Sequence, residues 1–326
     1  MIKKISTYTT SLCLLFFFAA TTVFSQDYAK VDQLVKSYPK SFSSPKKLAE
    51  RINADFTTET DKARAAFVWI AHNIQYDLKA YKDGTNTIAY SYSGEADRLA
   101  KEQKYRLEYA QKTLRSKKGV CQDYSALFHT VCDEIGLKCI DIIGTSKAHP
   151  TQIGKLPKTS DHEWNAVKIG DSWKLIDVTW ASGSVDTKTG KFVSDFNGGY
   201  FFTEPEVFFL NHFPDDKRLM MLNKTDQDFA VLPLYYGPYI ESKYEFTSPA
   251  YGIISLSKTS VVPFQIVNFP DGKITYVFTN EGRLRDIQPR QQGNITEFDI
   301  PMDARSRGYL TLYVDNKAVV TYKIER

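Results

Sequence analysis

The clearest hydrophobic pattern in this chain lies at residues 119–136, where apolar side chains recur with the period of an α-helix. The positions that form the apolar stripe are Ala126, Leu127, Val131, Cys132 and Ile135. The pattern predicts a helix that is buried along one face. The helix is expected to begin close to Cys121, directly after the dipeptide Gly119-Val120.

Cys121 is therefore expected in the first turn of this central helix. The positive end of a helix dipole favours the thiolate, which is the nucleophilic form of a cysteine. A lone cysteine in such a place is more often a buried structural residue, because a free thiol behaves as a small apolar side chain. Residues further along the chain decide between these two interpretations.

Helical periodicity also runs through residues 26–116. The predicted helices cover 27–37, a segment that starts at Ser44-Pro45, a segment from Thr60 to Tyr76 or Asp77, and 95–114. Serine and threonine commonly cap helix N-termini, and proline is favoured at the first helical position. A loop is predicted at 82–95, which is rich in Gly, Ser, Thr, Asn and Tyr.

After the central helix the pattern changes to that of β-strands. The alternating runs 162–169 and 173–179 are separated by Gly170-Asp171, which predicts a β-hairpin. Around this hairpin the sequence predicts a strand at 138–144, a loop at 181–199 and a short helix from about Pro205 that is capped by Thr203.

The last hundred residues lack helical periodicity and contain short β-prone runs separated by turns. The seven runs are 244–246, 252–256, 260–267, 273–279, 294–300, 309–314 and 318–324. Their number and spacing favour a small antiparallel sandwich. The predicted division is a domain at 26–228 and a β-sandwich domain at 229–326, the latter a scaffold or binding module without residues that suggest chemistry.

The composition is that of a folded protein, with 42% hydrophobic, 25% charged and 14% aromatic residues in a chain of 326. The formal net charge of +4 falls to +2 if the segment with Lys3 and Lys4 is removed. Such a charge is too small to indicate binding to nucleic acid or to an anionic membrane.

Residues 1–25 are predicted to be a cleavable export signal. Lys3 and Lys4 form a basic start, 12–23 is an apolar core, and Val23-Phe24-Ser25 places small residues where cleavage requires them. A membrane anchor is disfavoured, because the apolar run is short and no basic cluster follows it. The protein is therefore expected to be secreted or periplasmic, without a transmembrane segment after cleavage.

Removal of the signal would leave three cysteines: Cys121, Cys132 and Cys139. An odd number in an exported protein means at least one free thiol or an intermolecular bond. Cys132 and Cys139 lie in apolar stretches and are expected in the core. Even if these two pair with each other, Cys121 remains free.

A thiolate that attacks a carbonyl carbon needs a base beside it and a group that orients that base. His162 begins the first hairpin strand and Asp177 ends the second, and paired strands lie about 4.8 Å apart. The Asp177 carboxylate can therefore reach the His162 imidazole. Alone, His162 would more often be structural and Asp177 a turn cap. Together they predict Cys121 as nucleophile, His162 as base and then acid, and Asp177 as the orienting group.

Three segments, GVCQDYSALF, DHEWNAVKIGDSWKLIDVTW and WIAHNIQYD, resemble the transglutaminase-like superfamily of papain-like cysteine enzymes. The segment YFFTEPEVFFLNHFP resembles an extension in the branch that is similar to the kyphoscoliosis peptidase. The resemblance covers roughly residues 61–214 and implies an α+β fold with the nucleophile helix packed on an antiparallel sheet. It also implies the same three catalytic roles. Asp123 stands where many members have a small residue, which could alter the mouth of the pocket.

Other site candidates have equally plausible structural roles. Gln122 or Tyr76 could stabilise an oxyanion together with the Cys121 backbone N–H, or be a solvent-facing residue and a packed aromatic. Trp164 and Trp180 could wall the substrate cleft or belong to the core. The remaining histidines are expected to have structural roles or to lie on the surface: His72, His129, His149 and His212. No metal site or cofactor is predicted, because CxxC and HExxH patterns are absent.

The leading hypothesis is an exported cysteine enzyme that transfers the acyl group of an amide bond in a protein or peptide substrate. Hydrolysis by a peptidase or amidase is favoured over transfer to an amine by a transglutaminase. The alternative is a non-catalytic module of the same fold that binds proteins or cell-surface polymer, against which the three intact catalytic residues argue. A purely structural protein would leave the free thiol unexplained.

Overall fold

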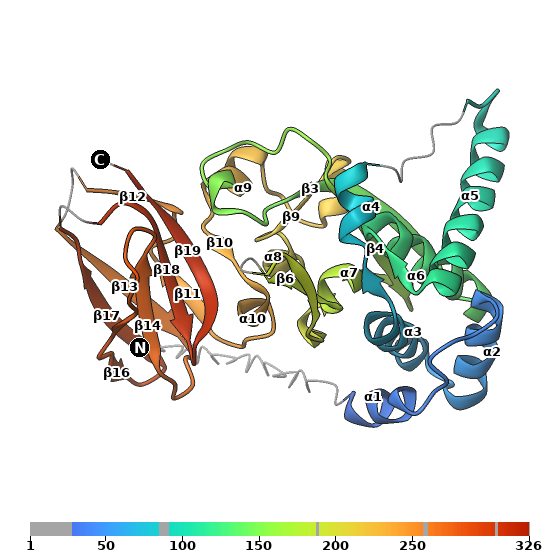
Figure 1. Ribbon diagram of the computed structural model, residues 1–326, viewed down its shortest axis with the longest axis horizontal. Coiled ribbons are helices and arrows are strands. Elements are labelled where there is room, and N and C mark those ends of the chain that lie inside the picture. Colours follow the sequence, from blue (N-terminus) through green and yellow to red (C-terminus); the bar gives the residue numbers. More distant parts are fainter. Residues whose placement is uncertain (1–27, 85–90, 187–188, 257–259, 304–305, 326) are drawn as a thin grey trace, which may run out of the picture.

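The computed structural model describes residues 28–84, 91–186, 189–256, 260–303 and 306–325. The predicted export signal lies outside these residues. In Figure 1 the helix-rich part, coloured blue to green, and the β-rich part, coloured orange to red, lie at opposite ends of the molecule. Across the part of the chain that the structure describes, no helix is both long and apolar enough to cross a bilayer.

Helices dominate the N-terminal part, as the periodicity predicts. They are α1 (Ala29–Lys36), α2 (Pro45–Asp55), α3 (Glu59–Asn73), α4 (Leu78–Asp83) and α5 (Glu95–Ser116). Ser44 caps α2 as expected, and its hydroxyl oxygen accepts from the Lys47 N–H at 3.3 Å. The predicted cap of α3 at Thr60 is wrong. Thr58 keeps the extended backbone of a cap residue and accepts from the Asp61 N–H at 3.1 Å.

The predicted extension of α3 to Tyr76 or Asp77 is also wrong, because a long-range pairing ends the helix at Asn73. Strand β1 (Gln75–Tyr76) pairs in parallel with β2 (Lys118–Gly119). Asp77 instead caps α4, accepting from two backbone N–H groups at 3.0 and 3.1 Å. The pairing sets Tyr76 opposite Gly119, close to the start of the central helix.

The central helix α6 (Cys121–Ile135) lies against a five-stranded antiparallel sheet. The sheet has the order β8-β5-β4-β3-β9, with β3 (Cys139–Ser146), β4 (His162–Ile169), β5 (Ser172–Ile176), β8 (Phe201–Thr203) and β9 (His212–Pro214). Leu127, Phe128 and Val131 are fully buried on the packed face of α6. The helix ends at Gly136, whose positive φ of 88° is a conformation that glycine adopts without a Cβ clash.

The predicted hairpin is present, but its second strand is shorter than predicted. Strands β4 and β5 pair from Ile169 with Ser172 to Asn165 with Ile176. Asp177 then leaves the sheet and caps the short helix α7 (Val178–Ala181), its side chain accepting from the Trp180 N–H at 2.9 Å. The prediction that strand structure continues to residue 179 is wrong because this cap starts a helical turn.

The segment after α7 contains more regular structure than predicted. A small hairpin, β6 (Gly183–Asp186) with β7 (Lys191–Ser194), occupies the described part of the expected loop. Helix α8 (Pro205–Phe208) starts at the predicted proline, but its cap is Glu204, since the Thr203 hydroxyl donates backwards to the Gly199 carbonyl at 2.6 Å. Two 3₁₀ segments lie after α7, at Gly198–Tyr200 and Lys217–Met220, and a third lies between β3 and β4, at Pro150–Gln152.

Every one of the seven predicted C-terminal runs contains a strand, and the strands form two sheets. One sheet has the order β10-β19-β18-β14-β15, with β12 pairing β19 in parallel, and the other has the order β11-β13-β17-β16. The bounds are β10 (Leu234–Tyr235), β11 (Glu245–Ser248), β12 (Ile253–Ser255), β13 (Val261–Val267), β14 (Ile274–Phe278), β15 (Arg285–Asp286), β16 (Arg290–Gln292), β17 (Ile295–Pro301), β18 (Gly308–Val314) and β19 (Lys317–Glu325). The rings of Phe264 on β13 and Tyr322 on β19 meet edge to face at 5.4 Å between the two sheets.

Two short helices join the halves of the chain: α9 (Asp226–Val231) and α10 (Gly237–Ile240). Helix α9 spans the predicted domain boundary at 228/229. The buried Lys147 side chain donates to the carbonyl oxygens of Ala230 and Leu232 at 3.4 and 2.9 Å, and to that of Phe229. Burial lowers the pKa of Lys147 to about 7. Because Lys147 directly follows β3, its hydrogen bonds connect the joining segment to the end of that strand.

A substitution at Gly144 tests how tightly the sheet is packed around His162. The two residues are direct partners in the pairing of β3 with β4. A Cβ there would lie 2.2 Å from the Phe213 carbonyl oxygen and 2.6 Å from the Trp164 ring. Gly144→Ala is expected to lower the free energy of unfolding by about 1–3 kcal/mol, because backbone and ring must shift. Gly282→Ala, with nothing within 4 Å of the added Cβ, is the matched control. Equal urea midpoints for the two variants would contradict this packing.

Candidate active site

Cys121 is the first residue of α6, and a fixed turn holds it there. Gly119 permits that turn, since a Cβ at this position would lie 2.4 Å from the Cβ of Asp123. The Asp123 carboxylate accepts from the Val120 N–H at 2.9 Å and thereby closes the helix N-terminus. The departure from the family pattern at Asp123 thus has a structural role at the helix start. Cys121 is a free cysteine, and the residue is half-buried.

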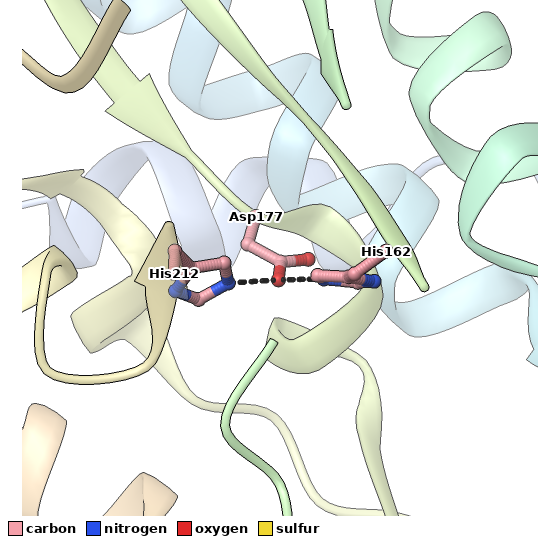
Figure 2. A group of neighbouring side chains, drawn as sticks. All are labelled: His162, Asp177 and His212. Carbon is pink, nitrogen blue, oxygen red and sulfur yellow. Dashed lines mark hydrogen bonds and ion pairs between the residues drawn. The ribbon is translucent and has the colours of Figure 1, made fainter. Parts of the chain in front are cut away.

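His162 begins β4, where it pairs with Gly144 of β3. Its imidazole is 7% exposed, and its Nε2 lies 2.7 Å from Oδ2 of Asp177. The predicted contact between the two residues is therefore present (Figure 2). Because Nε2 is engaged by the carboxylate, Nδ1 is the ring nitrogen that remains for the thiol.

Asp177 is fully buried and both of its carboxylate oxygens are engaged. Oδ1 accepts from the Trp180 backbone N–H at 2.9 Å, and Oδ2 accepts from His162. The turn-cap role and the orienting role, which the sequence offered as alternatives, are thus played by different oxygens of one side chain.

Charge and burial set the protonation states of this pair. Burial alone would raise the pKa of Asp177, but the charge of His162 and hydrogen bonds from His162 and His212 outweigh it and hold that pKa well below its usual range. Burial alone would lower the pKa of His162, but Asp177 and then the Cys121 thiol, each through charge and hydrogen bonding, raise it to about 10. At neutral pH the pair is a carboxylate and an imidazolium, and an adjacent cation favours a thiolate.

His212 is the residue of this site that the sequence did not assign to it. It begins β9, is 2% exposed, and places Nε2 at 3.0 Å from the same Oδ2 of Asp177 (Figure 2). The sequence does not predict the contact of His212 with Asp177, because 35 residues separate the two and no local pattern predicts that β9 pairs with β3. The only local sign was a histidine within an apolar segment, where a buried imidazole needs a partner.

Aromatic rings enclose the two histidines. The Trp180 ring stacks on His162 with centroids 5.2 Å apart and is half-buried, so it remains a candidate wall of the substrate cleft. The Trp164 ring lies 5.9 Å from His162 but is only 2% exposed and packs against Phe208. The cleft-wall prediction is therefore corrected for Trp164, which belongs to the core beneath the histidine.

The two oxyanion candidates lie at the start of α6. Tyr76 is half-buried, and its pKa is raised by burial first and by Cys121 next, so the phenol is neutral and close enough to Cys121 for their charges to interact. Gln122 follows Cys121 in the first helical turn and is half-buried. Tyr76 thus has the clearer relation to the thiol, and a phenol can donate a hydrogen bond to a developing negative charge.

The remaining histidines and cysteines have structural surroundings. The Nδ1 atom of His129 lies 2.9 Å from the Asp141 carboxylate, and His72 stacks on Phe196. His149 is exposed. Cys132 and Cys139 are free and buried, which confirms the core assignment.

His162, Asp177 and His212 also form the kind of group that can ligate a metal, since one atom from each lies within 4.8 Å of the others. Their N–O separations of 2.7 and 3.0 Å are ordinary hydrogen-bond lengths. Two ligands of a tetrahedral zinc ion would be about 3.3 Å apart. The observed spacing therefore suits direct hydrogen bonds between the side chains.

Comparison with known families agrees with this geometry. Residues 46–178 match the family model described as the transglutaminase-like superfamily, a range that contains Cys121, His162 and Asp177. The predicted family is thereby confirmed for residues 46–178, and the observed helices and antiparallel sheets confirm the predicted α+β fold class.

Individual relatives are similar over part of their length. The chain is 36% identical to the kyphoscoliosis peptidase of Mus musculus over 166 residues, which are 51% of this chain and 22% of that protein. The Homo sapiens kyphoscoliosis peptidase is 33% identical over 198 residues, 60% of this chain and 27% of that protein. The chain thus spans about a quarter of the length of these relatives. Among solved structures, red sea bream transglutaminase matches 93% of this chain and 59% of its own, with 10% identity and a TM-score of 0.27.

Proposed function

Residues 46–178 are a domain of the transglutaminase-like superfamily, and from this premise we propose that the protein is a cysteine-dependent acyl-transfer enzyme acting on amide bonds of proteins or peptides. One observation carries the proposal. The free thiol of Cys121, at the start of α6, interacts with His162, whose Nε2 atom lies 2.7 Å from the buried carboxylate of Asp177. A purely structural protein does not require a thiol that contacts an imidazole which in turn contacts a buried carboxylate.

The first chemical step is attack of the Cys121 thiolate on the amide carbonyl carbon. A C–S bond forms, and the π electrons of the carbonyl move onto its oxygen. The backbone N–H groups in the first turn of α6 face this end of the helix and stabilise the oxyanion. Tyr76 is the candidate for a further donor, since its neutral phenol is close enough to Cys121 for their charges to interact and its backbone pairs with Gly119 at the start of α6.

His162 transfers the proton in both halves of the reaction. Its imidazolium gives the Nδ1 proton to the leaving amine as the C–N bond breaks, which leaves a thioester on Cys121. The neutral imidazole then takes a proton from the incoming water or amine as that nucleophile attacks the thioester. The C–S bond breaks, Cys121 leaves as the thiolate, and the starting state with a His162 imidazolium is restored. Asp177 holds the ring orientation through both steps and stabilises the imidazolium.

We propose hydrolysis as the main outcome, with transfer to an amine as the competing one. Both begin from the same thioester, so a single assay separates them. Candidate amide and glutaminyl substrates are incubated with a fluorescent primary amine, and released acid and labelled product are quantified by mass spectrometry. Product that contains mostly the amine would reverse the proposed preference.

Alkylation of the thiol tests the proposal without a known substrate. Near pH 6 iodoacetamide is expected to label Cys121 at least about 10-fold faster than free cysteine, whose thiolate fraction there is about 0.3%. His162→Ala is expected to slow labelling to the rate of free cysteine, because the imidazolium that stabilises the thiolate is lost. Peptide mapping by mass spectrometry gives the rate at each cysteine.

The chain supplies its own controls for this experiment. Cys132 and Cys139 are buried and are expected to stay unlabelled in the folded protein. His149→Ala removes an exposed histidine and is expected to leave the Cys121 rate unchanged. Labelling of Cys121 at the free-cysteine rate in the unmodified protein would reject the enzyme and favour the binding module of the same fold.

We also propose that the protein is exported and cleaved after Ser25. Support comes from the basic start, apolar core and small residues of 1–25. Expression of the full chain followed by mass spectrometry of the mature N-terminus tests this, with Gln26 as the expected first residue.

A further inference from the structure

Two histidines, rather than one, hydrogen-bond to the same carboxylate oxygen in this site. In Figure 2 the carboxylate of Asp177 lies between the imidazoles of His162 and His212. The distances from Oδ2 to the two Nε2 atoms are 2.7 and 3.0 Å. The second imidazole is therefore part of the environment that determines what Asp177 does to the first.

The position of His212 is fixed from several sides. Its neighbour Asn211 is buried and its amide donates to the carbonyls of Lys147 and Tyr235, at 2.9 and 3.0 Å. The His212 ring stacks on Phe208 with centroids 3.9 Å apart and lies 4.6 Å from the Trp180 ring. A ring held in this way has little freedom to turn away from Asp177.

The charges around His212 define its protonation state. Burial, the largest influence, lowers the pKa of His212, and it outweighs the hydrogen bond and charge of Asp177 and the contact of Nδ1 with the Phe208 carbonyl oxygen at 3.3 Å. Of the two acceptors, the charged Asp177 oxygen is the nearer, at 3.0 Å from Nε2. A neutral imidazole that faces a carboxylate through Nε2 must carry its proton on that nitrogen. His212 is thus a neutral donor, whereas His162 is a cation.

Other titratable groups face this cluster from the neighbouring elements. Cys121 interacts with His162 from α6, and Glu163 of β4 lies close enough to His162 for their charges to interact. Tyr200 is close to Asp177. Burial raises the pKa values of both Glu163 and Tyr200 and so disfavours a negative charge on either group. The opposite charges that stabilise each other in this cluster are therefore those of His162 and Asp177.

We propose that His212 is a positioning residue that donates a second hydrogen bond to Oδ2 of Asp177, fixes that carboxylate, and limits how strongly it holds the proton of His162. The proposal rests on the proposed function, in which His162 must release its proton to the leaving amine. A carboxylate oxygen that is shared between two donors binds each less strongly. Without His212, the His162 imidazolium is more stable and a weaker acid.

Histidine NMR tests this directly, with or without a substrate. The chain has five histidines, so ¹⁵N-histidine labelling with single variants assigns every ring. In the unmodified protein, His212 is expected as the neutral Nε2–H tautomer and His162 as an imidazolium that titrates near pH 10. His212→Phe keeps the stacking but loses the donor, and is expected to raise the His162 midpoint by about one pH unit.

His212→Gln is the matched variant, because its side-chain amide retains an N–H donor near the position of Nε2. It is expected to return the His162 midpoint to near that of the unmodified protein. On an identified substrate, His212→Phe is expected to lower kcat about 3- to 10-fold with little change in KM, and His212→Gln to recover most of that loss. A residue that only fills space would give equal effects for the two variants and would not move the titration.

The outcomes separate this proposal from the proposed function. An unchanged His162 midpoint in folded His212→Phe protein, or an Nδ1–H tautomer of His212, overturns the positioning role whether or not the protein is active. A raised midpoint together with slow Cys121 alkylation supports the role of His212 and rejects the enzyme.

Discussion

Cys121→Ala is expected to abolish acyl transfer, lowering kcat by a factor on the order of 10⁵ or more. The reason is that no other described nucleophile lies at the N-terminus of α6 beside His162, so the thioester cannot form by another route. The fold should be unaffected. Cys121 is a half-buried helix-start residue, and its truncation is expected to change the free energy of unfolding by less than about 0.5 kcal/mol.

Cys132→Ala is the matched control, since it removes a thiol from the same helix about three turns further along. Cys132 is fully buried, so its truncation leaves a small cavity and is expected to lower the free energy of unfolding by about 1–2 kcal/mol. Its kcat should stay within about 2-fold of the unmodified protein. The two variants are compared by steady-state kinetics and by urea unfolding. A Cys121→Ala protein that retains a tenth of the turnover would exclude the thiol as the nucleophile.

Local pattern was sufficient to predict the elements that carry Cys121 and His162. The apolar stripe from Ala126 to Ile135 predicted α6, and the alternation around Gly170-Asp171 predicted the hairpin. Both signals are contained in fewer than twenty residues, and both agree with the packing that the elements adopt. The contact between His162 and Asp177 followed from the short hairpin turn alone, which leaves few other ways to arrange two paired strands.

Contacts between distant segments were not predictable in this way. The end of α3 is set by pairing of Tyr76 with Gly119, and nothing in residues 60–76 encodes that partner. His212 reaches Asp177 only because β9 pairs with β3 at the edge of the sheet. The sequence supplied the residue types for these contacts, but their spatial relation depends on the order of strands, which periodicity does not contain.

Asp177 shows how one side chain can satisfy two predictions that were framed as alternatives. Its Oδ1 atom closes the first turn of α7, and its Oδ2 atom receives both imidazoles. The cap fixes the carboxylate plane, so the oxygen aimed at His162 cannot rotate away without breaking a buried hydrogen bond. The structural role and the proposed catalytic role are therefore coupled at this residue, and its substitution should affect stability and turnover together.

Asp177→Asn is expected to lower kcat by about 10³- to 10⁴-fold. The amide oxygen can still cap α7, which turns the amide NH₂ toward the two Nε2 atoms. His162 must then carry its proton on Nδ1, so it presents a donor where Cys121 needs a base. Loss of the buried carboxylate is also expected to lower the free energy of unfolding by about 3–5 kcal/mol.

Asp141→Asn is a suitable control, because it changes the carboxylate of another His–Asp pair, with His129 at 2.9 Å. It is expected to lower stability while kcat stays within about 3-fold. Kinetics and urea unfolding of both variants separate damage to the fold from damage to the chemistry. Equal losses of kcat in the two variants would show that substitution of either carboxylate lowers turnover to the same extent. That result would contradict a specific role of Asp177 in catalysis.

The stability lost in Asp177→Asn should depend on pH in a defined window. The pKa of Asp177 is lowered in the folded state, so its contribution is present above the unfolded value of about 4 and is lost as pH falls below that. The pKa of His162 is raised to about 10, so its contribution is complete below the unfolded value of about 6.5 and is lost as pH rises toward 10. The difference in unfolding free energy between the unmodified protein and Asp177→Asn is therefore expected to be largest between about pH 4 and 6.5. Urea unfolding at pH 5, 7 and 9 measures it, and a difference that grew from pH 5 to pH 9 would mean that the buried pair is not a carboxylate with an imidazolium.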